Sequence, residues 1–171
     1  MQNHFELFQL PATFGIDVGA LNGAFHEIQG RVHPDKFATA PDAEKRVAMQ
    51  WATRANEAYQ TLKSPLKRAT YLCELNGIDL QTESNTAMPA AFLMQQMEWR
   101  EALDDARAAR DSRALDLLEA ELRKVRFAEL AHIGSRLDAQ DFAAAAQGIR
   151  KLMFVEKFGD DVARVLDALA D

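Results

Sequence analysis

Residues 17–37 read DVGALNGAFHEIQGRVHPDKF, and this stretch decides the fold of the first half of the chain. Asp17 is a good helix N-cap. The apolar residues after it recur every three or four positions, which is typical of one face of an α-helix. These residues are Val18, Leu21, Phe25, Ile28 and Val32. The helix must end near His33, because Pro34 disfavours the helical conformation in the residue before it. The stretch therefore predicts an amphipathic helix that runs directly into a stiff His-Pro-Asp turn.

Three more helices are expected around this one within residues 1–76. A short apolar segment, Phe5 to Leu10, ends at Pro11. Residues 34–41, PDKFATAP, are expected to form a loop between two prolines. A long helix is then predicted from Pro41 or Asp42 to Leu62, with proline acceptable in its first turn. Its expected apolar stripe consists of Val47, Trp51, Ala55, Ala58 and Leu62.

The fourth helix is predicted to begin at Ser64-Pro65 and to end at Asn76-Gly77, which is a good stop signal. The residues expected to face inward on it are Leu66, Ala69, Leu72 and Leu75.

The second half of the chain has a different character. Residues 77–88, GIDLQTESNTAM, are polar and lack helical periodicity, so they are interpreted as a linker. Residues 1–76 hold 8 basic and 8 acidic side chains, whereas residues 77–171 hold 12 and 18. Three longer helical patterns follow, at about 89–110, 112–137 and 141–170, and their short connections predict an up-down-up bundle. The expected organisation is therefore all-α, with domains at 1–76 and 89–171.

The overall composition excludes several classes of protein. The chain has 171 residues, of which 48% are hydrophobic and 27% charged, so collagenous and wholly disordered classes are excluded. A net charge of −6 argues against a general nucleic-acid binder. No apolar run approaches the roughly 20 residues of a membrane span, and the N-terminus does not resemble a secretory signal. The single cysteine, Cys73, cannot form an intrachain disulfide, so a cytoplasmic location is expected.

Signals for catalysis or metal binding are weak. The segment His26 to Gly30, HEIQG, fails as a zinc-protease helix because Gly30 stands where the second histidine should be. The four histidines and Cys73 have no ligand spacing. Cys73 is interpreted as a small packed residue rather than a nucleophile. A helical metalloenzyme that uses the histidines remains the alternative from another functional class.

The helix predicted at 89–110 has two apolar faces. At about 100° per residue, Phe92, Trp99 and Leu103 fall on one side, which is the better candidate for the bundle core. The other side mixes apolar and acidic residues, which suits an exposed surface for a partner protein. Its members are Leu93, Met94, Met97, Glu98, Glu101 and Asp105. The alternative is a helix that is buried on both sides.

Residues 1–76 resemble a J domain, in which two antiparallel helices are joined by a His-Pro-Asp loop. The whole chain resembles the HscB family of J-type co-chaperones of bacterial iron–sulfur cluster assembly. The segments that carry this resemblance are FELFQLP (5–11), HPDKFA (33–38), SPLKRATYL (64–72) and FLMQQMEWREAL (92–103). The chain also lacks the Gly/Phe-rich region and the paired-cysteine motifs of general J proteins. A general J-type co-chaperone for unfolded clients is nevertheless kept as the first alternative.

The resemblance implies a fold and a function. The fold would be a four-helix J domain joined to a three-helix scaffold-binding domain. The protein would not be an enzyme and would need no metal or cofactor. It would bring an IscU-type scaffold protein to a specialised HscA-type 70-kDa chaperone and stimulate the ATPase of that chaperone.

The resemblance also implies two sets of binding residues. Chaperone-binding residues would be Arg31, His33, Pro34, Asp35 and Lys36. Scaffold-binding residues would be Leu93, Met94, Met97, Glu98, Glu101, Asp105 and Phe154.

The chain departs from many J domains in two respects. Val32 precedes the loop where an aromatic residue is common, and Arg31 is the only lysine or arginine between Asp17 and His33. Electrostatic docking to the chaperone is therefore expected to be weak or selective.

Overall fold

The computed structural model describes residues 2–80 and 88–171, and every regular element in these ranges is a helix. The chain divides into two compact units, Met1–Leu72 and Cys73–Asp171. The prediction of an all-α protein is confirmed. The linker expected at 77–88 falls mainly on residues 81–87, which lie outside the described residues. In the part of the chain that is described, no helix has both the length and the apolar character needed to cross a bilayer.

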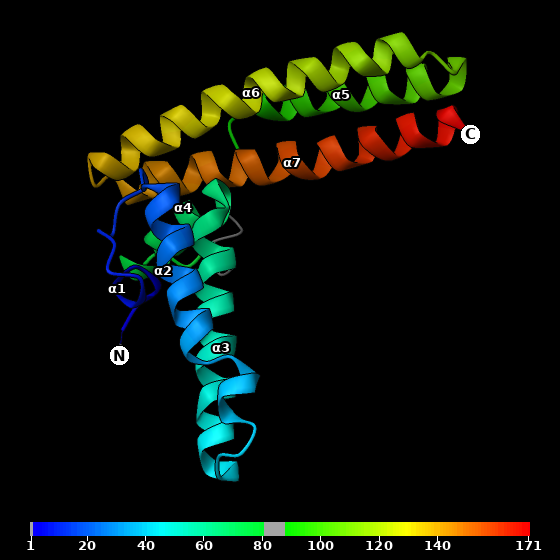
Figure 1. Ribbon diagram of the computed structural model, residues 1–171. Coiled ribbons are helices and arrows are strands. Elements are labelled where there is room, and N and C mark those ends of the chain that lie inside the picture. Colours follow the sequence, from blue (N-terminus) through cyan, green and yellow to red (C-terminus); the bar gives the residue numbers. More distant parts are fainter. Residues whose placement is uncertain (1, 81–87) are drawn as a thin grey trace. The chain divides into compact units, whose positions relative to one another are not determined.

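The first unit is built on a pair of helices that lie side by side, α2 (Val18–Arg31) and α3 (Asp42–Lys63) (Figure 1). The short α1 (His4–Leu7) precedes them, and α4 (Pro65–Leu75) follows and continues into the second unit. As the sequence predicts, the carboxylate of Asp17 caps α2 by accepting the Ala20 N–H at 3.1 Å. The turn between α2 and α3 contains a 3-10 helix, η1 (Pro34–Phe37), where a loop was expected.

Aromatic and apolar contacts join α2 to α3. The Phe25 and Tyr59 rings stack with centroids 4.1 Å apart, and the Tyr59 hydroxyl donates to Asn22 Oδ1 at 2.8 Å. Leu21 and Leu62 are fully buried. This packing holds the two helices in register and thereby sets the position of the turn that joins them.

A buried arginine connects α4 to the rest of the first unit. Arg68 donates from Nε to the Phe14 carbonyl at 2.6 Å and from Nη1 to the Leu62 carbonyl at 2.7 Å. Its guanidinium lies 4.9 Å from the centre of the Phe14 ring. Burial lowers the pKa of this group, and the two carbonyl acceptors offset the cost of removing the charge from water.

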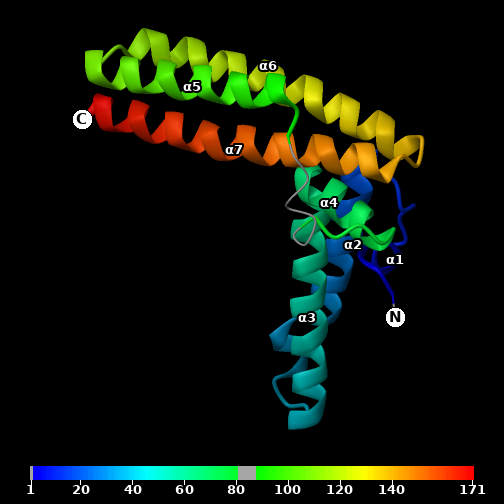
Figure 2. The same cartoon turned by 180° about the vertical axis from the view of Figure 1, so that it is seen from behind.

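The second unit is a bundle of three long helices, α5 (Ala90–Ala109), α6 (Ser112–Asp138) and α7 (Phe142–Ala170), which lie side by side in both views (Figures 1 and 2). Asp111 and Asp141 cap α6 and α7 by accepting backbone N–H groups at 3.1 and 3.2 Å. The two helices α6 and α7 pack closely at Gly148, where a Cβ atom would lie 2.8 Å from Glu129 Oε1 and 2.9 Å from Ile133 Cγ1. The predicted bundle is confirmed.

Four of the predicted core positions are wrong, because Val18, Val47, Trp51 and Leu75 are exposed. Val18 and Leu75 are the first and last residues of their helices. Val47 and Trp51 lie in the half of α3 nearest the η1 turn, whereas the four-residue α1 packs near the other end of the α2–α3 pair (Figures 1 and 2). A periodic pattern identifies the face of a helix, but not how far along that face a neighbour extends.

Candidate functional site

The His-Pro-Asp segment forms a short, self-capped turn. His33 is the N-cap of η1, and its Nδ1 accepts the Asp35 N–H at 3.2 Å. Pro34 occupies the first position of the 3-10 helix, where its missing N–H costs nothing. Asp35 Oδ2 lies 3.6 Å from the same Nδ1, which is too far for a hydrogen bond.

The charged groups of the turn face solvent. The Asp35 side chain is 91% exposed and that of His33 is 54% exposed. Pro34 and Lys36 are also exposed. The structure therefore brings four of the predicted chaperone-binding residues together on one turn. A carboxylate on a turn whose backbone is held this way can accept a hydrogen bond from a partner cation with little loss of backbone entropy.

Arg31 lies one helical turn before this group. Its guanidinium forms an i,i+4 ion pair with Glu27, and both side chains are largely exposed. The only lysine or arginine of α2 is thus already paired with an acid. The first unit offers a partner an exposed carboxylate and imidazole at the turn, but no basic stripe along α2.

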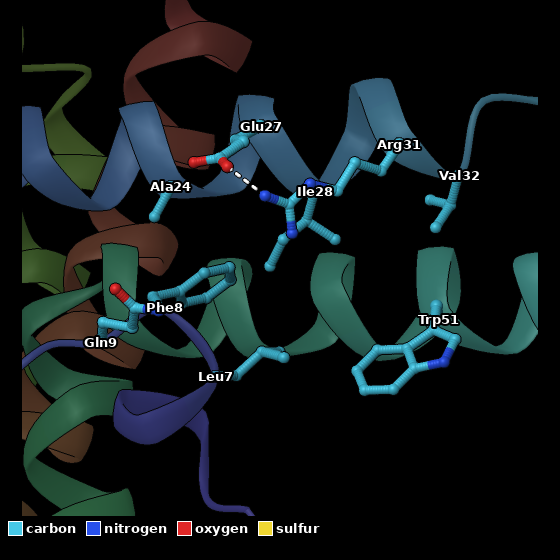
Figure 3. Close-up of a pocket in the computed structure, with 9 residues that line it drawn as sticks. All are labelled: Leu7, Phe8, Gln9, Ala24, Glu27, Ile28, Arg31, Val32 and Trp51. Carbon is cyan, nitrogen blue, oxygen red and sulfur yellow. Dashed lines mark hydrogen bonds and ion pairs between the residues drawn. The ribbon is translucent and has the colours of Figure 1, made fainter.

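An open pocket of about 410 Å³ adjoins the last turn of α2. Figure 3 shows Leu7 and Phe8 on one side of it and Trp51 of α3 farther along, toward Val32. The other lining residues are Gln9, Ala24, Glu27, Ile28 and Arg31. The pocket is large enough to receive a side chain of a partner, and its walls combine apolar residues with Gln9 and the Glu27–Arg31 ion pair. The sequence does not predict this pocket, because Trp51 fits the apolar stripe of its helix. The shortness of the helix expected to end at Pro11 is the one feature that points to it.

The second group of predicted site residues lies on α5. Leu93, Met94 and Met97 are 46%, 62% and 70% exposed, and Glu98, Glu101 and Asp105 are exposed as well. On the opposite side, Trp99 and Leu103 are buried. Of the two interpretations of this helix, the structure confirms the one in which only the aromatic face is core. We call Leu93, Met94 and Met97 the α5 patch.

Phe154 is placed apart from the α5 patch. Its ring lies 5.8 Å from Phe92 and 6.4 Å from Trp99, and it stacks on Phe158 at 5.9 Å. Phe154 therefore belongs to an aromatic cluster between α5 and α7, where it is half-buried. Of the predicted scaffold-binding residues, six share the outer surface of α5, and Phe154 lies at the junction with α7.

The remaining candidate ligands and nucleophiles do not converge. Among residues 2–80 and 88–171, no three His, Cys, Asp or Glu side chains are grouped so that they could hold a metal ion. Cys73 is buried, and burial raises the pKa of its thiol to about 11. A thiol of this kind is almost entirely protonated at neutral pH and is a poor nucleophile, as expected for a packed residue.

Comparisons with known proteins agree in both halves of the chain. Residues 88–163 match the family described as the HSCB C-terminal oligomerisation domain. The chain is 56% identical, over 167 residues, to the co-chaperone protein HscB homolog of Burkholderia multivorans, and this match covers 98% of this chain and 95% of that protein. A homologue with the same name from Burkholderia mallei is 55% identical over the same length.

Solved structures show the same fold. Chaperone HscB from Vibrio cholerae is 40% identical with a TM-score of 0.86, and the match covers 98% of this chain and 99% of that one. The human co-chaperone protein HscB is 26% identical with a TM-score of 0.89, over 95% of this chain and 81% of the human one. The resemblance identified in the sequence is confirmed over nearly the whole chain.

Proposed function

The chain belongs to the HscB family of co-chaperones, and from this premise we propose that it brings an IscU-type iron–sulfur scaffold protein to an HscA-type 70-kDa chaperone. The J domain stimulates the ATPase of the chaperone, and the α5 surface holds the scaffold. The iron–sulfur cluster is the cargo of this process and not a resident cofactor. A cytoplasmic location is part of the proposal.

One observation carries the proposal. A single chain presents two exposed surfaces of different chemistry, each built on a separate compact unit. The first is the η1 turn, whose Asp35 side chain is almost fully exposed. The second is the α5 patch, where three large apolar side chains face solvent beside acidic ones. Exposed apolar groups of this kind are typical of protein-binding sites, and two such surfaces suit an adaptor that joins two partners.

The role assigned to the turn is recognition and not catalysis. Asp35 is offered as a hydrogen-bond acceptor for a cation on the chaperone, and its backbone is held by the bond to His33 Nδ1. Because Arg31 is paired with Glu27, α2 adds little positive charge to the contact. The pocket beside Val32 and Trp51 is available for further contact. We therefore expect the stimulation to depend only weakly on salt concentration.

The direct test is a steady-state ATPase assay of an HscA-type chaperone, with and without this protein and an IscU-type scaffold. The proposal expects this protein alone to raise the rate, and the scaffold to raise it further. Absence of stimulation by the wild-type protein would contradict the proposal. A pull-down tests which partners the protein binds. The proposal expects one dominant small scaffold partner, whereas a broad set of unfolded clients would favour a general J-type co-chaperone.

A further inference from the structure

A groove lined by arginines runs between the C-terminal half of α5 and the end of α7. Its volume is about 560 Å³. Four arginines line it, together with two aspartates and four apolar residues. The charged residues are Arg100, Arg107, Arg110, Arg164, Asp104 and Asp161. Residues 77–171 carry a net charge of −6, whereas the groove has four arginines and two aspartates. The groove is therefore a positively charged site on a negatively charged part of the chain.

Two of the arginines are held in place by other groups. Arg164 is ion-paired with Asp161. The Arg100 guanidinium lies 5.6 Å from the centre of the Phe154 ring and 6.0 Å from that of Phe158. Stacking of this kind fixes the position of the cation without neutralising it.

The other two arginines keep their charge available. Within the described part of the chain, neither Arg107 nor Arg110 takes part in an ion pair or a side-chain hydrogen bond, and both are exposed. Leu103 and Val165, which line the same groove, are nearly buried. The groove thus combines free guanidinium groups with an apolar floor, which suits a chain segment that carries both carboxylates and an apolar side chain.

The groove is continuous with the α5 patch. At about 100° per residue, Arg100 and Arg107 fall within about 40° of Leu93 on the side toward α7. Glu98, Glu101 and Asp105 fall on the other side of Leu93, at about 80–140°. Arginines therefore lie on one side of Leu93, and Glu98, Glu101 and Asp105 lie on the other. Met97, at about 40°, lies between the two groups, whereas Met94, at about 100°, lies among the carboxylates. Asp104, at about 20°, is the one acid of α5 beside the groove arginines.

We propose that this arginine groove binds an acidic segment of the same protein that covers the α5 patch. The inference rests on the proposed function, in which that protein is the iron–sulfur scaffold. Charge complementarity identifies the segment as acidic, and continuity with the patch assigns it to the same partner. Opposite charges on the two sides of Leu93 and Met97 favour one orientation of the partner and oppose the reverse one. The groove would therefore determine how the scaffold is oriented on α5.

The test is calorimetric titration of an IscU-type scaffold into the full-length protein at low and at physiological salt. The variant is Arg107→Glu/Arg110→Glu, and the matched control is Arg123→Glu/Lys124→Glu, a double charge reversal on exposed residues of α6. We expect the groove variant to lose about tenfold or more in affinity at low salt and to show a flatter salt dependence. The control should behave as wild type.

Three outcomes would overturn the inference. One is wild-type affinity and salt dependence in the groove variant. Another is an equal loss in the control, which would show only a general charge effect. The third is saturable binding of inorganic phosphate to the free wild-type protein, if the groove variant loses this binding. That result would make the groove a small-anion site. If the variant melts early, Arg107→Gln/Arg110→Gln replaces it. Failure of the wild-type protein to bind the scaffold would instead refute the proposed function.

Discussion

Replacing Leu93, Met94 and Met97 together with alanine should separate scaffold binding from chaperone stimulation. The three side chains form the α5 patch, on a different compact unit from the η1 turn that carries Asp35. We expect the triple variant to bind an IscU-type scaffold weakly and to retain the basal ATPase stimulation given by the J domain.

The structure sets the expected effect on stability. The three side chains are 46%, 62% and 70% exposed, so each loses only part of a buried apolar surface when it is truncated. At about 1.5–3 kcal/mol for burying a whole side chain, the three partial losses together amount to about 2–4 kcal/mol. A single truncation of a buried leucine such as Leu122 should cost about 2–5 kcal/mol, because it also leaves a cavity.

The expected effect on binding is larger. Central apolar anchors of an interface often contribute about 1–2 kcal/mol or more each. Loss of three anchors should therefore weaken the scaffold complex by about a hundredfold or more, at about 1.4 kcal/mol per factor of ten. Titration calorimetry with the scaffold measures this change, and thermal unfolding of the same sample measures the change in stability.

Leu117 and Phe127 on α6 provide the matched control. They are 65% and 79% exposed, so Leu117→Ala/Phe127→Ala removes comparable apolar surface outside the patch. This variant should bind the scaffold as the wild type does. Unchanged scaffold affinity in a stable triple variant would show that the binding site lies elsewhere. A collapse of the melting temperature in the triple variant would show that the face is part of the core.

Four further predictions concern the turn, two glycines and a histidine. Asp35→Asn should nearly abolish ATPase stimulation and leave the melting temperature unchanged. It removes a charge-assisted hydrogen bond to the chaperone, of a kind typically worth about 1.5–3 kcal/mol. Full stimulation by this variant would exclude the proposed contact. Gly23→Ala should stabilise the protein against urea by up to about 1 kcal/mol, since Gly23 is inside α2 and nothing lies within 4 Å of the added methyl group. Gly148→Ala should instead destabilise it by about 1–3 kcal/mol, because the methyl group would meet Ile133 Cγ1 at 2.9 Å, and a neutral effect in denaturant titration would refute this reasoning. Burial lowers the pKa of His4 below its usual 6.5 despite Glu57, so the unfolded chain binds a proton more readily than the folded one. The free energy of unfolding should therefore decrease as the pH falls below the pKa that His4 has in the unfolded chain. Melting curves of His4→Gln should lack this decrease.

Much of the local structure could be predicted from the sequence because its causes are local. The cap at Asp17, the stop at Pro34 and the stop at Gly77 depend on residues within one helical turn, and the predicted boundaries agree closely with α2, α3 and α4. The two faces of α5 were also predictable. A helical period of 3.6 residues places Trp99 and Met97 on opposite sides of the helix, whatever the tertiary contacts are.

What lies on those faces could be predicted less well. Trp51 and Val47 fit an apolar stripe, yet both are exposed, because the four-residue α1 does not extend far enough along α3 to cover them. The stacking of Phe154 on Trp99 is similarly a product of how α5 and α7 meet. Periodicity assigns a direction to a side chain but contains no information about the length of the neighbouring element.

The sequence by itself determined the helices, the exposed His-Pro-Asp turn and the apolar surface of α5, because each of these arises from short-range backbone preferences and helical periodicity. Only the tertiary structure decided the pocket beside Val32 and the arginine groove. Arg164 lies more than fifty positions after Arg110 in the chain, and no local pattern relates them. They line one groove because α5 and α7 pack in the same bundle, so that separate charges combine into a single binding surface.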